Sequence, residues 1–308
     1  MSCDGVKNPV IYPSIWIGDY SSKADFDINL ENINAASVVY DWMDDRILFS
    51  RHPFDYNAYC AVCDCVQLMN VRWDGLSNGS AFPAWTETVV CHHCGLNSRM
   101  RALYYYVKTR INRSLVRKAY IAEAITGSYN YLSCLLPELV GTEYIDKNLK
   151  PGEFALVPYC EKPIQHEDLT SLSFADGKFD LVITQDVFEH ISNYQKSFKE
   201  IARVLSSNGS LIFTIPFFSD LSTTRVRAKV TNTGIEHIMP PEIHGNPVSQ
   251  AGSLCYQNFG WDILEDLRNS GFSEAFASMY WGPWQGHMGR PFFVFCATKY
   301  QSRLYASL

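Results

Sequence analysis

The stretch that most constrains the fold of this chain runs from Phe179 to Thr184. Apart from Asp180, these residues are apolar or β-branched, and a turn-forming Asp-Gly pair precedes them. A nearly continuous apolar strand is typical of a parallel sheet covered on both faces, because a half-exposed hairpin strand would alternate. Polar residues, Gln185 and Asp186, follow directly. The pattern predicts an open α/β sheet whose ligands bind at the carboxyl ends of its strands.

The residues around this strand form a longer pattern. An acidic residue with an apolar partner is followed by an Asp-x-x-Phe-Asp turn, the apolar strand and a Glu-His-Ile ending. These are Asp168, Leu169, Asp176–Asp180, Leu181–Thr184 and Glu189–Ile191. The segment resembles the fourth-strand region of class I S-adenosylmethionine-dependent methyltransferases. The resemblance implies a Rossmann-like, seven-stranded α/β sheet and S-adenosyl-L-methionine as the cofactor.

Length and charge narrow the classes of function. With 308 residues, the chain can hold one large α/β domain and a smaller module. A net charge of −6 leaves no basic footprint, which argues against a nucleic-acid partner. No apolar run approaches the length of a membrane span, and the first residues do not resemble a signal peptide. We therefore expect a cytoplasmic protein without a membrane partner, and the sequence does not indicate its oligomeric state.

Two Cys-x-x-Cys pairs indicate a metal site. Cys60 and Cys63 are separated by 27 residues from Cys91 and Cys94. Each tight turn can aim two thiolates at one point, and the two pairs together complete a tetrahedron. The spacing predicts a structural zinc ion, because four protein ligands leave no open position. Spare candidate ligands are Cys65, His92 and His93.

A helix is expected directly after the second pair. Asn97 or Ser98 can cap it, and apolar residues recur at helical spacing as far as Ile111. The run Cys-x-x-Cys-Gly-x-Asn-Ser-Arg-x-Arg, from Cys91 to Arg101, resembles an N-terminal zinc module found before some bacterial methyltransferase domains.

The first strand of the catalytic domain is predicted at 119–123, with a helix from about Asn130 to Leu136. Methyltransferases of this class carry Asp/Glu-x-Gly-x-Gly-x-Gly in the turn between these elements, where glycines let the backbone approach the cofactor. This chain keeps Glu123 and Gly127, but Ile125 and Tyr129 replace the other two glycines.

Acidic residues at the ends of the next two strands extend the predicted cofactor site. Glu143 lies at the end of a strand predicted at 139–144, about twenty residues after Glu123, where a carboxylate can accept both ribose hydroxyls. The resemblance implies that Glu143 binds the ribose and that Asp168 accepts the adenine amino group. Tyr144 and Leu169 would lie against the adenine, Asp186 would end the fourth strand at the site, and Asp146 is the alternative to Glu143.

The sequence indicates less about the methyl acceptor than about the cofactor. Residues 217–257 break the α/β rhythm, and this insertion resembles the variable acceptor-binding segment of such enzymes. A hydroxyl or ammonium acceptor needs a base, for which His244, His190 and His237 are the first candidates and Asp186 and Glu189 the next. We expect a small acceptor, such as a sugar or a natural-product intermediate. The alternative is a non-catalytic, zinc-stapled scaffold or binding subunit, which the two missing glycines favour.

These features predict three regions: an extension at 1–55, a zinc-binding module with its linking helix at 56–116, and a methyltransferase domain at 117–300. In the extension, residues 27–48 are compatible with a helix that has Val38, Val39 and Trp42 available for burial.

Overall fold

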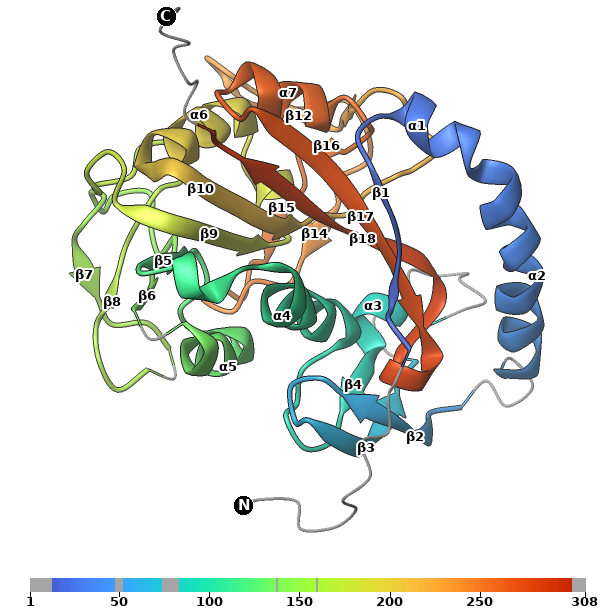
Figure 1. Ribbon diagram of the computed structural model, residues 1–308. Coiled ribbons are helices and arrows are strands. Elements are labelled where there is room, and N and C mark those ends of the chain that lie inside the picture. The colour runs from blue at the N-terminus through green and yellow to red at the C-terminus, as the bar shows by residue number, and fades with distance from the viewer. Residues whose placement is uncertain (1–12, 48–51, 74–82, 137, 159, 301–308) are drawn as a thin grey trace, which may run out of the picture. The chain divides into compact units, whose positions relative to one another are not determined.

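The computed structural model describes residues 13–47, 52–73, 83–136, 138–158 and 160–300. The chain, whose helices and strands are labelled in Figure 1, divides into two units. Unit 1 takes in the described parts of Met1–Tyr20, Ala24–Ile111 and Ser278–Val294. Unit 2 takes in the described parts of Ser21–Lys23, Asn112–Ala277 and Phe295–Leu308. The three regions expected from the sequence stay a prediction. Among the helices in the described ranges, none is long and apolar enough to cross a membrane.

Unit 1 contains a small antiparallel sheet that carries both cysteine pairs. Its strands are β2 (Phe54–Cys60), β3 (Cys65–Val71) and β4 (Val89–Cys91), in that order. The short helix α3 (Trp85–Thr88) precedes β4, and α4 (Ser98–Arg110) follows it. Apolar side chains from all three strands, including Met69 and Val89, form a buried core beside the cysteines.

Helix α4 begins where the sequence predicts. The Asn97 side chain accepts a hydrogen bond from the Met100 N–H at 2.9 Å and donates one to Glu87 at 2.8 Å. Arg101, one turn into the helix, is fully buried and donates to the carbonyl oxygens of Gln285 and Gly286, each at 2.7 Å. The Asn-Ser-Arg-x-Arg run therefore builds the start of α4 and fastens it within unit 1.

We expect Asn97→Ala to lower the free energy of unfolding by about 1 kcal/mol, because the Met100 N–H loses its capping acceptor. Chemical denaturation followed by circular dichroism measures the change. Asn97→Ser is the matched control, since its hydroxyl can still cap the helix, and it should recover most of the loss. Equal losses in the two variants would show that the cap contributes nothing.

The central sheet has seven strands in the order β1-β17-β18-β10-β9-β5-β6, and it confirms the predicted fold class. In unit 2, β5, β6, β9 and β10 are parallel, and β18 runs antiparallel to β10. Strands β17 and β18 pass through both units. The strands of this sheet are β1 (Trp16–Tyr20), β5 (Ala119–Ile121), β6 (Leu139–Gly141), β9 (Phe179–Gln185), β10 (Leu205–Thr214), β17 (Glu274–Gly282) and β18 (His287–Thr298).

Helices cover both faces of the sheet in unit 2, which explains why β9 is almost continuously apolar. Figure 1 shows α5 (Gly127–Leu135) on one face and α6 (Tyr194–Val204) and α7 (Ile263–Asn269) on the other. Aromatic rings fill the layer under α6, with ring centroids of Phe188 4.8 Å from Phe198 and 5.2 Å from Phe213. Short 3-10 turns lie at η1 (Arg113–Leu115), η2 (Phe188–His190) and η3 (Pro283–Gln285).

Four elements of unit 2 differ from their predicted limits. Strand β5 ends at Ile121 rather than at 123. Helix α5 begins at Gly127 rather than near Asn130. Thr126, which has an extended backbone, is the last residue before the helix. Strand β6 ends at Gly141, so Glu143 lies beyond it and forms an isolated parallel bridge with His166. The strand predicted to end at Asp168 is shorter in the structure. It is β8 (Ile164–Gln165), which pairs with β7 (Phe154–Ala155).

The insertion at 217–257 consists of short paired strands, in agreement with the predicted break in the α/β rhythm. Strand β11 pairs with β16, β12 with β13, and β14 with β15. The six strands are β11 (Arg225–Val226), β12 (Ala228–Thr231), β13 (Gly234–His237), β14 (Ile243–His244), β15 (Ser253–Leu254) and β16 (Gln257–Asn258).

The N-terminal extension contributes a strand as well as helices. Strand β1 joins the edge of the central sheet beside β17, which the sequence did not predict. Helices α1 (Lys23–Ile28) and α2 (Leu30–Ile47) replace the single expected helix, whose last residue, Leu48, is outside the described residues. The expected burial is wrong on α2, where Val38, Val39 and Trp42 are 68%, 49% and 59% exposed.

Candidate functional site

The four cysteines of the two Cys-x-x-Cys pairs lie together in unit 1. The Sγ atoms of Cys60 and Cys94 are 3.8 Å apart, and those of Cys63 and Cys91 are 3.9 Å apart. All four sulfur atoms lie within 4.8 Å of one another. A tetrahedral zinc ion with Zn–S bonds of about 2.3 Å places its sulfur ligands about 3.8 Å apart, so the cluster fits zinc.

The two cysteine turns share one backbone geometry. The Asp64 N–H donates to the Cys60 carbonyl at 2.8 Å, and the Gly95 N–H donates to the Cys91 carbonyl at 2.9 Å. Both donor residues have positive φ, 59° for Asp64 and 73° for Gly95. Glycine adopts this conformation freely, and aspartate is among the few other residues that tolerate it. Gly95 and Asp64 therefore have equivalent roles in the two turns.

The spare candidate ligands are not part of the cluster. Cys65 Sγ accepts a hydrogen bond from the Gln67 amide at 3.0 Å, and His92 lies 3.3 Å from Asp55. His93 is exposed. Among the described residues, the group of potential ligands in this module contains the four cysteines alone.

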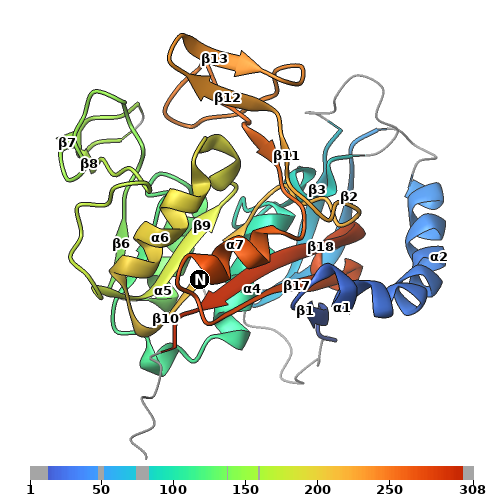
Figure 2. The same ribbon diagram turned by 90° about the horizontal axis from the view of Figure 1, so that it is seen from above.

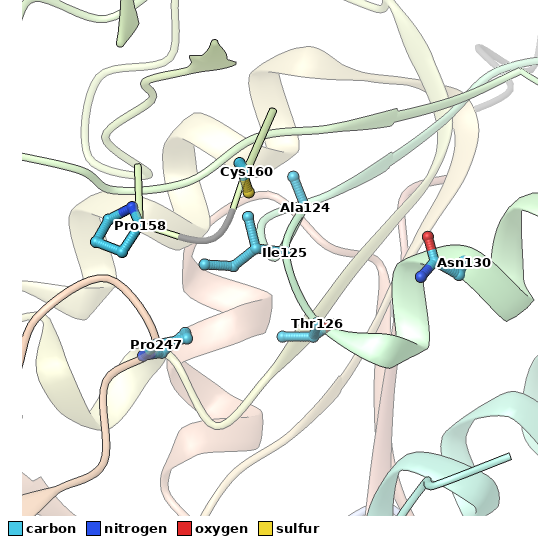
Figure 3. Close-up of a pocket in the computed structure, with 7 residues that line it drawn as sticks. All are labelled: Ala124, Ile125, Thr126, Asn130, Pro158, Cys160 and Pro247. Atoms are coloured by element: carbon cyan, nitrogen blue, oxygen red, sulfur yellow. The ribbon is translucent and has the colours of Figure 1, made fainter. Parts of the chain in front are cut away.

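In unit 2, the turn after β5 lines a cavity of about 310 Å³. Figure 3 shows Ala124, Ile125 and Thr126 on this turn, with Asn130 on α5 and Pro247 from the insertion. Pro158 and Cys160 complete the lining. The cavity therefore lies at the carboxyl end of β5, where ligands bind in open α/β sheets.

Glu143 is connected directly to this turn. Its Oε1 atom accepts a hydrogen bond from the Ile125 N–H at 3.0 Å. The side chain is 7% exposed, and burial raises the pKa of the carboxyl to about 7, although the backbone N–H groups of Ile125 and Ala124 act in the opposite direction. A buried carboxyl beside a cavity, with a pKa near neutrality, is a candidate ligand-binding group.

Tyr129, which replaces a glycine of the family pattern, packs against Gly141. A Cβ atom on Gly141 would lie 2.6 Å from the Tyr129 ring, which is too close for any real side chain. The glycine at the end of β6 therefore makes room for the Tyr129 ring beside the turn. In this way the sheet accommodates one of the two departures from the glycine pattern.

The other predicted cofactor residues lie along the same edge of unit 2. The Asp168 Oδ1 atom accepts a hydrogen bond from the Thr170 N–H at 2.7 Å, and Leu169 is buried beside it. Tyr144 is half-exposed, with its ring centroid 5.2 Å from that of His166. Glu123 is buried, and Gly127 opens α5.

Asp186, at the end of β9, has an unusual backbone. Its φ angle is 53°, and its side chain accepts a hydrogen bond from the Thr214 hydroxyl at 2.8 Å. Its N–H donates to the Thr214 carbonyl at 3.0 Å. A non-glycine residue held in the left-handed region by such contacts is common at functional sites.

Two of the three predicted catalytic histidines come together. The ring centroids of His190 and His244 are 5.1 Å apart. The neighbouring Cys255 thiol and Glu189 carboxylate raise the pKa of His244 to about 11. His237 is not with them: it is exposed at the end of β13, and Figure 2 shows the β12–β13 hairpin projecting from the rest of unit 2.

Residues 128–213 match the family model described as a methyltransferase domain. The chain carries a methyltransferase domain. The matched segment runs from α5 to β10 and contains Glu143, Asp168, Asp186 and His190. The match confirms the methyltransferase predicted from the sequence. Among curated proteins, no sequence matches the chain.

Solved methyltransferase structures resemble the chain at low identity. One is the 1,6-didemethyltoxoflavin-N1-methyltransferase of Burkholderia thailandensis with bound 1,6-didemethyltoxoflavin and S-adenosylhomocysteine. It is 14% identical, with a TM-score of 0.38, and the alignment covers 66% of this chain and 78% of that one. Another is an S-adenosylmethionine-dependent methyltransferase of Mesorhizobium loti, 13% identical, with a TM-score of 0.39 and coverage of 64% and 97%.

Proposed function

We propose that this methyltransferase transfers the methyl group of S-adenosylmethionine to a small hydroxylated or amino acceptor. The observation that carries the proposal is the Glu143 carboxylate, which lies within the matched segment and accepts a hydrogen bond from the cavity-lining Ile125. When bound, the cofactor supplies a methyl group that is already activated as a sulfonium. The chain must then mainly align the acceptor with that group and exclude water.

The residues present fit the adenosine part of this cofactor. The Glu143 carboxylate would accept the ribose hydroxyls, as acids at this position do in nucleotide-binding α/β folds. Asp168 would accept the adenine amino group, with Leu169 and Tyr144 against the ring. Glu123, Gly127 and Asp186, at the ends of β5 and β9, would contact the remainder of the cofactor.

We further propose that Cys60, Cys63, Cys91 and Cys94 hold a structural zinc ion. The sulfur–sulfur distances support this assignment. Four thiolates saturate a tetrahedral ion, so the metal would stabilise unit 1 without acting on the substrate.

The insertion would supply the acceptor side, because Pro247 already lines the cavity. The assignment of His244, His190 or His237 as the base that removes a proton stays a prediction. The raised pKa of His244 counts against it, since an imidazole with a pKa of about 11 is protonated at neutral pH and cannot accept another proton. The exposed position of His237 counts against that residue.

One observation favours a second candidate, a non-catalytic binding subunit. The Ile125 side chain lines the cavity at a position where methyltransferases of this class have glycine (Figure 3). A side chain there takes up space that the backbone would otherwise leave to the cofactor.

Calorimetric titration with S-adenosylhomocysteine separates the two candidates. We expect saturable binding of one molecule per chain, followed in activity assays by methylation of a member of a panel of small hydroxylated and amino compounds. A folded protein that releases no binding heat at millimolar ligand, and shows no binding by equilibrium dialysis, would overturn the proposed function.

A further inference from the structure

Three ligand-type side chains converge near the carboxyl end of β9, away from the four-cysteine cluster. His190 ends η2, His244 ends β14, and Cys255 lies between β15 and β16. One ligand atom from each lies within 4.8 Å of the other two. All three residues belong to unit 2, and two of them come from the insertion.

In each imidazole, one ring nitrogen contacts a hydrogen-bond acceptor and the other faces the group of ligand-type side chains. The Nδ1 atom of His190 lies 3.0 Å from the Leu254 carbonyl oxygen, to which only an N–H can donate. The Nε2 atom of His244 lies 3.0 Å from a Glu242 carboxylate oxygen. When a metal ion displaces the ring protons that face the group, these acceptors favour the tautomers in which Nε2 of His190 and Nδ1 of His244 are free to bind it. Histidines that bind metals are usually oriented by such a partner on the far nitrogen.

The Cys255 sulfur lies in the same group as the two imidazoles. Its Sγ atom lies 3.3 Å from Nδ1 of His244 and 3.1 Å from Nε2 of the same ring. The residue is 2% exposed, so its thiol faces the two rings and not the solvent.

Glu189 provides an independent observation. Its side chain is 0% exposed, and neither carboxylate oxygen has a hydrogen-bond partner among the described residues. Its Oε1 atom lies 3.6 Å from Nε2 of His190 and 3.7 Å from Nδ1 of His244, the two nitrogens that face the group. A buried carboxylate without hydrogen bonds is costly unless a cation compensates it.

We propose that His190 Nε2, His244 Nδ1 and Cys255 Sγ bind a second zinc ion, whose charge the buried Glu189 carboxylate beside the two histidines compensates. Tetrahedral zinc, with bonds of about 2.0–2.3 Å to nitrogen, oxygen and sulfur, separates its ligand atoms by roughly 3.3–3.7 Å. The separations between nitrogen and sulfur or oxygen fall close to this range. The two positive charges of the ion balance one thiolate and one carboxylate, so the buried site is neutral.

Backbone and side-chain hydrogen bonds already hold the segments that carry these ligands. The Tyr256 N–H donates to the Glu189 carbonyl at 2.7 Å, and the Gln257 amide donates to the carbonyls of Phe188 and Ile191 at 2.7 and 3.0 Å. The ion would therefore clamp the insertion onto η2. With both histidines bound to zinc, the acceptor's proton would have to go to another group.

A metal-free arrangement is the competing explanation. A protonated His244 could pair with Glu189 and Glu242 and leave the Cys255 thiol without a metal role. The two arrangements differ in metal stoichiometry, which is measured without cofactor or acceptor. The result is therefore independent of the proposed methyl transfer.

The test is the zinc content of the full chain after loading with Zn²⁺ and removal of the excess by gel filtration. We expect two zinc ions per chain in the unmodified protein. His244→Ala and Cys255→Ser should each retain one. The matched controls, His237→Ala in the same insertion and the exposed Cys134→Ser, should retain two.

Loading with Co²⁺ gives a second readout that does not depend on the folding of a variant. The unmodified chain should take up two cobalt ions, and Cys255→Ser should lose only part of the thiolate-to-cobalt charge-transfer absorption. Circular dichroism establishes that each variant is folded. An unmodified chain that saturates at one ion, with that ion lost in Cys63→Ser, would overturn the second site. Unchanged zinc content in folded His244→Ala and Cys255→Ser would do the same.

Discussion

Cys63→Ser should lose one zinc ion per chain and unfold the small sheet formed by β2, β3 and β4. The four sulfur atoms already lie at separations that suit one tetrahedral ion, so removing one thiolate leaves an incomplete site. Structural zinc sites of this kind contribute on the order of 10–16 kcal/mol at neutral pH, and that binding energy is folding energy. The remaining apolar core of the module is too small to replace it.

Cys65→Ser is the matched control for this result. Cys65 lies on the same hairpin, opposite Cys60, but its sulfur accepts a hydrogen bond from Gln67 and is not part of the cluster. Elemental analysis should show the same zinc content in Cys65→Ser as in the unmodified protein, and limited proteolysis should cleave the β2–β3 hairpin, residues 54–71, only in Cys63→Ser. Full zinc occupancy in Cys63→Ser would exclude that thiolate as a ligand.

The parts of the fold that the sequence predicted are those in which local pattern and tertiary environment agree. The apolar run at 179–184 is a strand because helices cover both faces of the sheet, so every position favours the same residue types. The pairs Cys60/Cys63 and Cys91/Cys94 could be recognised because the ligand spacing of a tight turn is fixed by backbone geometry. Asn97 caps α4 through contacts within four residues.

The parts that the sequence did not predict depend on partners far along the chain. Strand β1 has no distinctive pattern, and it becomes a strand only by pairing with β17. Cys255 gave no signal, because its neighbours His190 and His244 come from segments 65 and 11 residues away. Arg101, which reads as a surface charge, is buried because two carbonyl oxygens at the β17–β18 connection accept its hydrogen bonds.

Glu143→Ala should weaken S-adenosylhomocysteine binding by about ten- to a hundredfold. Hydrogen bonds to a charged group contribute roughly 1.5–3 kcal/mol, and each 1.4 kcal/mol is a factor of about ten in affinity. The variant also removes the acceptor of the Ile125 N–H, so the turn that lines the cavity becomes less well held. Asp168→Ala should have a smaller effect, because adenine also packs against apolar neighbours. The exposed Glu236→Ala is the matched control and should bind like the unmodified protein.

The pH dependence of binding tests the same carboxyl in a different way. Burial raises the Glu143 pKa to about 7 in the free protein, whereas ribose hydroxyls that donate to the carboxylate would stabilise its charged form and lower the pKa in the complex. Below pH 7, binding must therefore release a proton. By linkage, affinity should fall by as much as about tenfold for each pH unit below 7 and become constant above it.

Glu143→Gln separates this charge effect from a loss of shape. Glutamine has nearly the same size and can still accept a hydrogen bond from Ile125, but it does not titrate. The variant should bind S-adenosylhomocysteine more weakly at pH 8 and show a nearly flat profile between pH 5.5 and 8, as measured by calorimetry in buffers of different ionisation enthalpy. If the unmodified protein shows the same flat profile, or if Glu143→Ala binds with unchanged affinity, the ribose is held elsewhere, and Asp146 becomes the next acid to test.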